Sequence, residues 1–224
     1  MATTASPRSS RAAAKPPALT TIFLVRHGQT ATTGKVLPGR ARGLHLAEAG
    51  VQQARRAAER IAELKRIDGV YTSPLERARE TAAPIGAATG HTPKVDRGLL
   101  ECDFGEWTGA SLRRLSRKRE WATVQRAPST FRFPGGESFT EMQVRIVTAL
   151  ERLRDAHPGG TIVCVSHADP IKAAVAHALG THLDLFQRIV IGTCSISSIA
   201  WSTGGPVVLA VNSTGRPLNE LVPS

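Results

Sequence analysis

Short apolar runs alternate with helix-spaced apolar residues along positions 20 to 212 of the chain. Runs of four to eight apolar or β-branched residues bounded by turn residues are typical of strands. Such runs predict strands at 21–25, 68–73, 160–166, 194–201 and 206–212. Apolar residues three or four positions apart predict helices at 46–64, 75–88, about 139–153 and about 169–180.

Two of these helices have a buried face that the sequence defines. In the first, the apolar side chains that recur at helical spacing are Ala54, Ala57, Ala58, Ile61 and Leu64. The third helix follows a chain break, "PGG" at 134–136, and Ser138 with Glu141 forms a capping box at its start. Its buried face is predicted to consist of Phe139, Met142, Ile146, Leu150 and Leu153.

The order of the elements predicts an α/β fold. Strands alternating with helices imply a three-layer sandwich, with a mostly parallel central sheet and helices on both faces. The run "GTIVCVS" at 160–166 has almost no polar alternation, which predicts a strand buried on both faces. The last two strands are joined by a short link through "TGG", so they must pair as an antiparallel edge.

Two regions depart from this regular pattern. Residues 105–133 are irregular apart from a basic, helical piece, "SLRRLSRKREW" at 111–121. Residues 1–19 are rich in Ala, Ser, Thr and Pro and lack acids and an apolar segment. That composition excludes a secretory signal and favours a disordered basic extension over a transit peptide. With no internal repeat, residues 20–224 are predicted to form one domain.

Charge and cysteine content narrow the class of protein. The net charge is +11, which fits nucleic-acid binding, an anionic substrate or an arginine-rich genome. The cations are scattered, so nucleic-acid binding is not favoured. The three cysteines lack the spacing of a metal or redox pair, which fits a reducing cytosol and a cytoplasmic protein. No apolar run approaches the roughly 20 residues that span a bilayer, so no membrane association is expected.

The stretch "FLVRHGQTATTGK" at 23–35 is the first candidate for chemistry, because α/β proteins often bind phosphate after a strand. It is not a nucleotide-binding P-loop. Five residues separate Gly28 from Gly34, and Val36 follows Lys35 where a hydroxyl residue is needed. What remains is Arg26–His27 at the carboxyl end of one strand and His167 at the end of another. If the strands are neighbours, two histidines meet at one edge of the sheet.

Five motifs then occur in order: "RHGQT", "YTSPLERARETA", "LLECDFGEWTG", "PGGES" and "VSHADPIKA". Together they resemble the histidine phosphatase superfamily, which includes phosphoglycerate mutase and many small phosphatases, and the resemblance covers about residues 20–212. It implies that His27 is the nucleophile and is transiently phosphorylated. It also implies that Arg26, Arg77 and His167 surround the transferred phosphate. Glu101 would donate a proton to the leaving group, with Asp103 and Glu106 as fallback candidates.

The residue types suit this chemistry. A neutral imidazole is a nucleophile that phosphate charge does not repel, and guanidinium groups match phosphate oxygens with fixed forks of donors. The backbone N–H of Ala168, at a helix start, could supply another donor. With so many cations no metal or other cofactor is required. Glu101 must be protonated to act as the acid, so burial and bound phosphate must oppose the nearby cations that favour its ionised form.

The chain departs from the family pattern at three positions. Thr33 stands where most members have an asparagine that touches phosphate, and its hydroxyl has a shorter reach. Thr30 matches the family's Ser or Thr and is the safer phosphate donor. Ala168 replaces a glycine but keeps its amide. Ala47 stands where a capping threonine is common, so the helix at 46–64 is expected to start weakly.

The branch of the family sets the predicted reaction. Mutases carry a longer insertion between the acid and "PGGES", whereas only 32 residues separate Glu101 from Pro134 here. The prediction is a metal-independent phosphomonoesterase acting on a small phosphorylated metabolite through His27. A phosphomutase that needs a bisphosphate primer is the alternative, and a binding protein is disfavoured because all five core residues are present. A homodimer is common among relatives.

Other residues have structural explanations. The basic cluster is more simply a solvated helix face than a pocket mouth selecting anionic substrates; its members are Arg113, Arg114, Arg117, Lys118 and Arg119. Phe104 and Trp107 are expected to pack in the core, and Gly135 with Gly136 to form a turn. The remaining histidines are expected to be structural or solvated: His45, His91, His157, His177 and His182.

Overall fold

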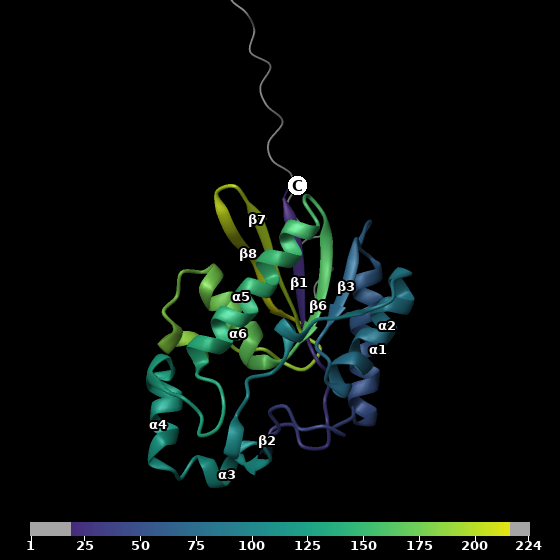
Figure 1. The fold of residues 1–224 in the computed structure, drawn as a ribbon. Helices are drawn as coiled ribbons and strands as arrows, with labels where there is room; N and C mark the ends of the chain where they lie inside the picture. The colour runs from purple at the N-terminus through teal and green to yellow at the C-terminus, as the bar shows by residue number, and fades with distance from the viewer. Residues whose placement is uncertain (1–18, 216–224) are drawn as a thin grey trace, which may run out of the picture.

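A computed structural model of the chain describes residues 19–215 (Figure 1). The extension predicted at 1–19 therefore lies outside the described residues, except for its last residue. Six strands form one sheet in the order β4-β3-β6-β1-β7-β8. Their bounds are β1 Thr20–Arg26, β3 Gly69–Thr72, β4 Lys94–Val95, β6 Thr161–Ser166, β7 Ile196–Ser202 and β8 Gly205–Ser213.

The sheet is mostly parallel with an antiparallel edge, as the sequence predicts. Strands β4, β3, β6 and β1 run parallel to their neighbours, while β7 pairs antiparallel with both β1 and β8. The short turn between β7 and β8 enforces that antiparallel pairing. Strand β4 was not predicted, because two exposed residues give no periodic pattern.

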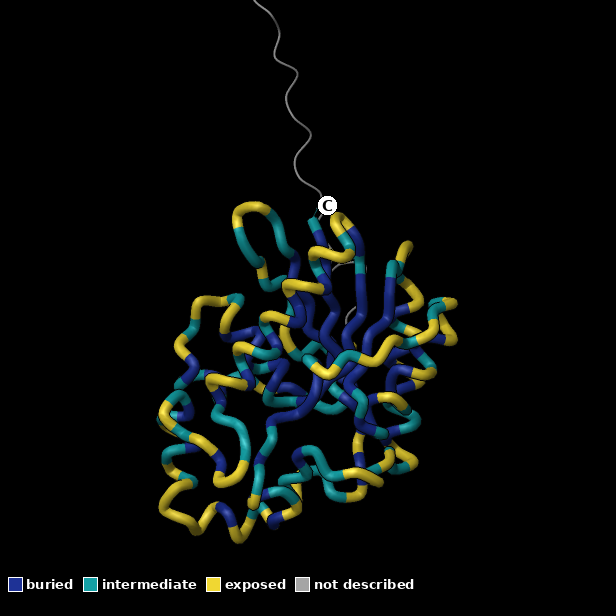
Figure 2. The backbone as a smooth tube through the Cα atoms, in the orientation of Figure 1, coloured by how far each residue is buried: buried dark blue, intermediate teal, exposed yellow. Residues whose placement is uncertain are grey.

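Side chains alternate across the sheet and bury two separate cores. Ile22 and Leu24 of β1 pack in the core on one face, and Phe23 and Val25 pack in the core on the other. Each such buried side chain contributes roughly 1.5–3 kcal/mol. The helices α5 (Phe139–Ala156) and α6 (Ala168–Ala178) cover the first face, and α1 (Glu48–Ala62) and α2 (Glu76–Thr89) cover the second (Figure 1). The predicted three-layer sandwich is confirmed, with buried strands inside an exposed shell (Figure 2).

The helix starts follow their local sequences. At the start of α5, Ser138 Oγ accepts from the Glu141 amide at 3.1 Å and Glu141 Oε2 accepts from the Ser138 amide at 3.0 Å, so the predicted capping box forms. All five predicted core residues of α5 are buried. Helix α1 begins after Ala47, which offers no side-chain cap, as expected. No helix within residues 19–215 combines the length and apolarity needed to cross a membrane.

The basic segment at 111–121 was predicted to be helical, and most of it is, although not as one helix. It forms two short helices, α3 (Leu112–Leu115) and α4 (Arg119–Arg126), with the chain turning between them. Leu115 and Val124 anchor the two helices in the core. Just before α3, β5 (Ala110–Ser111) pairs with β2 (Val36–Leu37), a two-stranded ladder too short for the sequence to reveal. This region lies beyond the end of the main sheet in Figure 1.

Four three-ten helices complete the connections. They span Arg97–Leu99, Gly105–Trp107, Pro128–Thr130 and Leu183–Arg188. The first leads directly to Glu101, and the last lies beside α6. Phe104 and Trp107 are buried beside Phe133, which confirms that they pack in the core.

Candidate active site

The two central strands bring the two predicted histidines together. Strands β1 and β6 are parallel neighbours with Arg26 opposite Ser166, so His27 and His167 follow at the same level. Their ring centroids are 5.1 Å apart with the planes tilted by 58°. Ligands bind at the carboxyl edge of open α/β sheets. The strand-end argument from the sequence therefore holds.

His27 is buried and held in one tautomer. Its Nδ1 lies 2.8 Å from the Gly28 carbonyl oxygen, which can only accept, so Nδ1 carries the ring proton. Nε2 then has the free lone pair, and Arg77 Nε donates to it at 3.3 Å. Burial lowers the pKa of His27 to about 3, with the charges of Arg77 and Arg26 acting in the same direction. The ring is therefore neutral at pH 7, as a nucleophile must be.

His167 faces the same space from the end of β6. Its Nε2 lies 2.8 Å from Ser73 Oγ. That oxygen accepts from the Leu75 amide at 3.4 Å and can donate its own proton to Nε2. In that tautomer the His167 Nδ1 carries the ring proton and can act as a donor. Burial, with the positive charge of Arg77, places the pKa of His167 well below its usual range.

Three buried nitrogens of the site have no hydrogen-bond partner among the described residues: Arg26 Nε, Arg77 Nη1 and His167 Nδ1. Leaving a buried donor unsatisfied costs about 1–3 kcal/mol. Arg77 is fully buried, and its Nη2 donates to the Gly39 carbonyl at 2.7 Å. Arg26 Nη1 donates to the Ile191 carbonyl at 2.7 Å. An anion bound beside His27 would accept hydrogen bonds from these three nitrogens. The sequence alone could not show that they lack partners.

Glu101 contributes a buried carboxyl group to the same site. It is 6% exposed, and its Oε1 accepts from the Cys102 amide at 2.9 Å. Burial raises the pKa of Glu101 to about 7 and the charge of Asp169 adds to the rise, against the opposing effect of Arg77 and Arg26. The effect of burial on the pKa of Glu101 thus exceeds that of the nearby cations. A proton donor to the leaving group requires this. The fallback Asp103 is paired with Arg40, and Glu106 is exposed.

A cleft of about 320 Å³ joins these groups. Its walls include six of the predicted residues, Arg26, His27, Thr30, Thr33, Glu101 and Ala168. Arg77 and His167 lie behind His27, which they contact. Thr33 Oγ1 accepts from the Thr30 amide at 2.9 Å and lies 3.1 Å from Thr30 Oγ1, so the two hydroxyls share one side of the cleft.

Four residues that line the cleft were not predicted from the sequence. Asp169 and Lys172 of α6 line it with Gln187 and Ile191. Lys172 Nζ donates to Gln187 Oε1 at 3.0 Å and lies 3.4 Å from Asp169 Oδ1. Asp169 and Lys172 belong to the quoted motif "VSHADPIKA", so the signal was present. Gln187 belongs to no recognised motif, and it reaches the cleft only through the tertiary fold.

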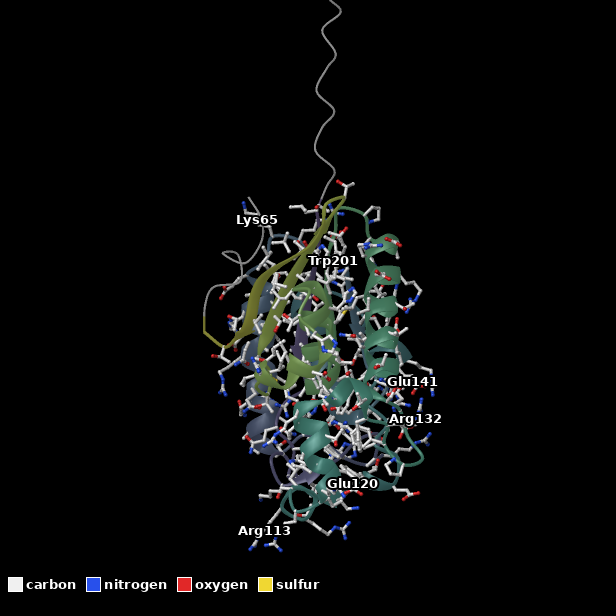
Figure 3. The ribbon with its side chains drawn as sticks, turned by 90° about the vertical axis from the view of Figure 1, so that its left-hand side faces the viewer. Lys65, Arg113, Glu120, Arg132, Glu141 and Trp201 are labelled. Carbon is white, nitrogen blue, oxygen red and sulfur yellow. The ribbon has the colours of Figure 1, made fainter. Side chains whose placement is uncertain are left out.

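The basic cluster stands apart from the cleft. All five of its cations are exposed, and none of them lines the cleft, although the preceding Leu112 does. Figure 3 shows Arg113 at the far tip of the molecule. Lys118 lies 5.3 Å from the centre of the Trp107 ring, a cation–π contact on the surface. The five cations thus form a solvated surface on α3, the turn after it and the start of α4, rather than the mouth of the cleft.

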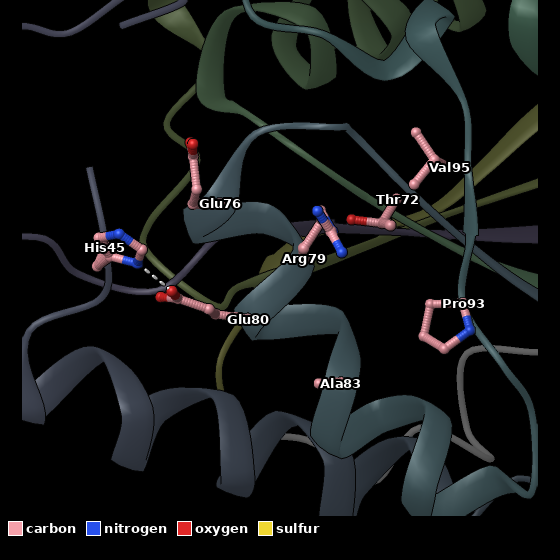
Figure 4. Close-up of a pocket in the computed structure, with 8 residues that line it drawn as sticks. All are labelled: His45, Thr72, Glu76, Arg79, Glu80, Ala83, Pro93 and Val95. Atoms are coloured by element: carbon pink, nitrogen blue, oxygen red, sulfur yellow. Dashed lines mark hydrogen bonds and ion pairs between the residues drawn. The ribbon is translucent and has the colours of Figure 1, made fainter. Parts of the chain in front are cut away.

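The other histidines are engaged elsewhere. His157 bonds Tyr71 at 2.7 Å, and His91 bonds the Thr89 carbonyl at 2.8 Å. His45 pairs with Glu80 in a second pocket, which shares no lining residue with the cleft (Figure 4). Within residues 19–215, no group of three or more His, Cys, Asp or Glu side chains could hold a metal ion.

Comparison with known proteins assigns a family to this arrangement. Residues 22–214 match the model of the histidine phosphatase superfamily, branch 1. The bifunctional protein Rv2228c of Mycobacterium tuberculosis is 31% identical over 208 residues, which cover 88% of this chain and 54% of that protein. The chain thus matches about half the length of that relative.

Two further relatives are similar over most of their length. Phosphoserine phosphatase 1 of Hydrogenobacter thermophilus is 32% identical over 202 residues, covering 86% of this chain and 92% of that one. The solved structure of a phosphoserine phosphatase from Entamoeba histolytica, in complex with 3-phosphoglyceric acid, has a TM-score of 0.78 and 27% identity. That likeness covers 91% of this chain and 100% of the other.

Proposed function

The chain belongs to the histidine phosphatase superfamily, and on that premise we propose that it is a metal-independent phosphomonoesterase. It hydrolyses a small phosphorylated metabolite through a phosphohistidine at His27. The observation that carries the proposal is the neutral, buried His27, whose unprotonated Nε2 accepts from Arg77, beside nitrogens of Arg26, Arg77 and His167 that have no partner among the described residues. Such a site combines a nucleophile with preorganised positive charge.

Phosphate binding follows from those unsatisfied donors. Arg77 turns its donor from His27 Nε2 to a phosphate oxygen, which frees the lone pair. Arg26 and His167 Nδ1 supply further hydrogen bonds to the phosphate. The hydroxyls of Thr30 and Thr33 and the Ala168 amide at the start of α6 complete the set. Charge that spreads over the equatorial oxygens during transfer meets fixed donors.

The reaction then has two steps. In the first, His27 Nε2 forms a bond to phosphorus, the phosphorus–oxygen ester bond breaks, and the leaving oxygen takes the proton of Glu101. In the second, the Glu101 carboxylate takes a proton from water, whose oxygen attacks phosphorus and releases His27. A carboxyl with a pKa of about 7 suits both roles near neutral pH.

The relatives support the substrate class but do not fix the substrate. Two of them are named as phosphoserine phosphatases, so a small phosphorylated metabolite is the fitting class for this chain. Its cleft of about 320 Å³ is of a size for such a molecule. A cytoplasmic location, a single catalytic domain and a homodimer stay predictions.

The test is phosphate release from a panel of phosphomonoesters with a chelator present, comparing the natural protein with His27→Ala. Release that persists with chelator and disappears in the variant is the expected result. Acid-labile labelling of the natural protein, but not of the variant, would identify the phosphohistidine. Failure to release phosphate from any ester contradicts the proposal. Adding a bisphosphate primer and following isomerisation then tests the mutase alternative.

A further inference from the structure

Arg145, on α5, uses every donor of its guanidinium group. Nε and Nη2 bind the two carboxylate oxygens of Glu137 at 2.8 and 3.0 Å. Nη1 donates to the carbonyls of Gly98 at 2.9 Å and Leu100 at 2.8 Å, and Nη2 also donates to the Glu101 carbonyl at 3.2 Å. An arginine has five N–H donors in a fixed fork. Three of them therefore fix the short segment that ends in Glu101.

Glu137 holds the same segment from its other end. Its Oε2 accepts from the Asp103 amide at 3.0 Å, and its own amide donates to the Asp103 carbonyl at 2.9 Å. Arg40 joins the network, with Nη2 at 2.8 Å from Glu137 Oε1 and Nε donating to the Glu101 carbonyl at 2.9 Å. Backbone on both sides of Glu101 is thus bonded to one network of two arginines and one glutamate.

The network matters because the segment has no strand to support it. Glu101 lies between the three-ten helix Arg97–Leu99 and that at Gly105–Trp107, in irregular backbone. Among residues 19–215, the Glu101 carboxyl accepts one hydrogen bond, from the adjacent Cys102 amide. The position of the carboxyl therefore depends on where the backbone is held. Arg145, Glu137 and Arg40 hold it at Gly98, Leu100, Glu101 and Asp103, and Ser166 Oγ donates to the Leu99 carbonyl at 2.8 Å.

We propose that Arg145 and Glu137 are positioning residues, which hold Glu101 where it can give its proton to the leaving oxygen. This inference rests on the proposed function. A general acid must lie within hydrogen-bond reach of the oxygen that it protonates, and a displacement of about 1 Å can cost on the order of 100-fold in rate. Neither residue lines the cleft, so neither is placed to contact the substrate there.

The experiment separates positioning from simple stabilisation by varying the leaving group. An alkyl phosphate has a poor leaving group that needs a proton to depart. The leaving group of 2,4-dinitrophenyl phosphate departs without one. Arg145→Lys and Glu137→Gln are expected to lower kcat/KM for the alkyl ester by about 10- to 100-fold, part of the roughly 10²–10⁴-fold that general acids supply. For the activated ester the loss should stay below about 3-fold.

Two controls make the comparison sharp. Glu101→Gln shows the effect of losing the acid completely. The ratio of kcat/KM for the two esters in Arg145→Lys and Glu137→Gln should shift toward the ratio in Glu101→Gln. Ile61→Val, in the core on the other face of the sheet, lowers stability without touching residues 98–103. It should change both esters equally. Thermal denaturation of every variant shows whether losses in stability are matched.

Equal losses on both esters in Arg145→Lys and Glu137→Gln would overturn the positioning role while leaving the phosphatase proposal intact. If Arg145→Lys does not fold, Glu137→Gln and Arg40→Lys decide the outcome by the same ratio. A natural protein that hydrolyses neither ester would overturn this inference together with the proposed function. A ratio that rises toward that of Glu101→Gln supports the inference.

Discussion

The two halves of the cleft are built on different supports. The phosphate half stands on the ends of β1 and β6, where His27 and His167 are fixed by the register of neighbouring strands. The leaving-group half stands on irregular backbone around Glu101, held by side-chain bonds from Arg40 and Arg145. The first support is made of many backbone hydrogen bonds and the second of a few charged side chains. Single substitutions should therefore affect the two halves in different ways.

The largest expected effect breaks the leaving-group half and leaves the other intact. Glu101→Gln should lower kcat/KM for alkyl esters by about 10²–10⁴-fold and change an activated aryl ester much less. In the natural protein the alkyl reaction should fall above about pH 7, because Glu101 loses its proton there. The variant should lose that decline. The ratio of the two esters, measured from pH 5 to 9, checks both statements.

An equal loss on both esters in Glu101→Gln would mean that the residue does not act as the acid. Asp103 and Glu106 would then be tested in the same way. The control is Glu106→Gln, since Glu106 is exposed and does not line the cleft.

The next effect in size breaks the phosphate half. Arg77→Lys removes the fork that meets His27 Nε2 and the Gly39 carbonyl, and a lysine cannot replace it. Losing one preorganised donor typically costs about 10²–10³-fold. We expect that loss on alkyl and activated esters alike, because both pass through the same phosphoryl transfer. A loss confined to alkyl esters would place Arg77 in the leaving-group half instead.

The same contrast explains what the sequence could predict. Strand ends follow from apolar runs, and the motifs place Arg26, His27 and His167 on them, so the phosphate half was predictable. The leaving-group half was not, except for Glu101 itself. Arg145 lies in an ordinary helical pattern, and its contacts with the segment before Glu101 depend on a tertiary approach that has no periodic signature.

Short elements explain the remaining errors. The predicted helical piece at 111–121 became α3 and α4, because buried anchors at Leu115 and Val124 outweighed local propensity. The pair β2–β5 and strand β4 have two residues per strand, fewer than any alternating pattern needs. Gln187 reaches the cleft only through the packing of the final three-ten helix. Long apolar runs were predicted well because they bury the most surface.

The smallest expected effect is on the free energy of unfolding. Glu101 and His27, one from each half of the cleft, should change it with pH in opposite directions. The folded pKa of Glu101 is raised from 4.5 to about 7. Below pH 4.5 both states hold the proton. As pH rises, the unfolded chain releases it first, so Glu101 costs stability, with the full cost reached above pH 7. The difference corresponds to about 3 kcal/mol. Glu101→Gln should therefore unfold at higher denaturant concentration than the natural protein at pH 8, and not at pH 4.

His27 in the phosphate half has the opposite sign. Its folded pKa is lowered from 6.5 to about 3, so its contribution is present above pH 6.5 and is lost as the pH falls toward 3. His27→Gln should reduce the loss of stability between pH 6.5 and 4 and leave the curve at pH 8 unchanged in shape. Urea unfolding of both variants across this range measures the two slopes. If Glu101→Gln shows no gain at pH 8, the pKa of the carboxyl is not raised in the folded protein. Glu101 would then be ionised well below pH 7, and the proton that the leaving group needs must come from another residue.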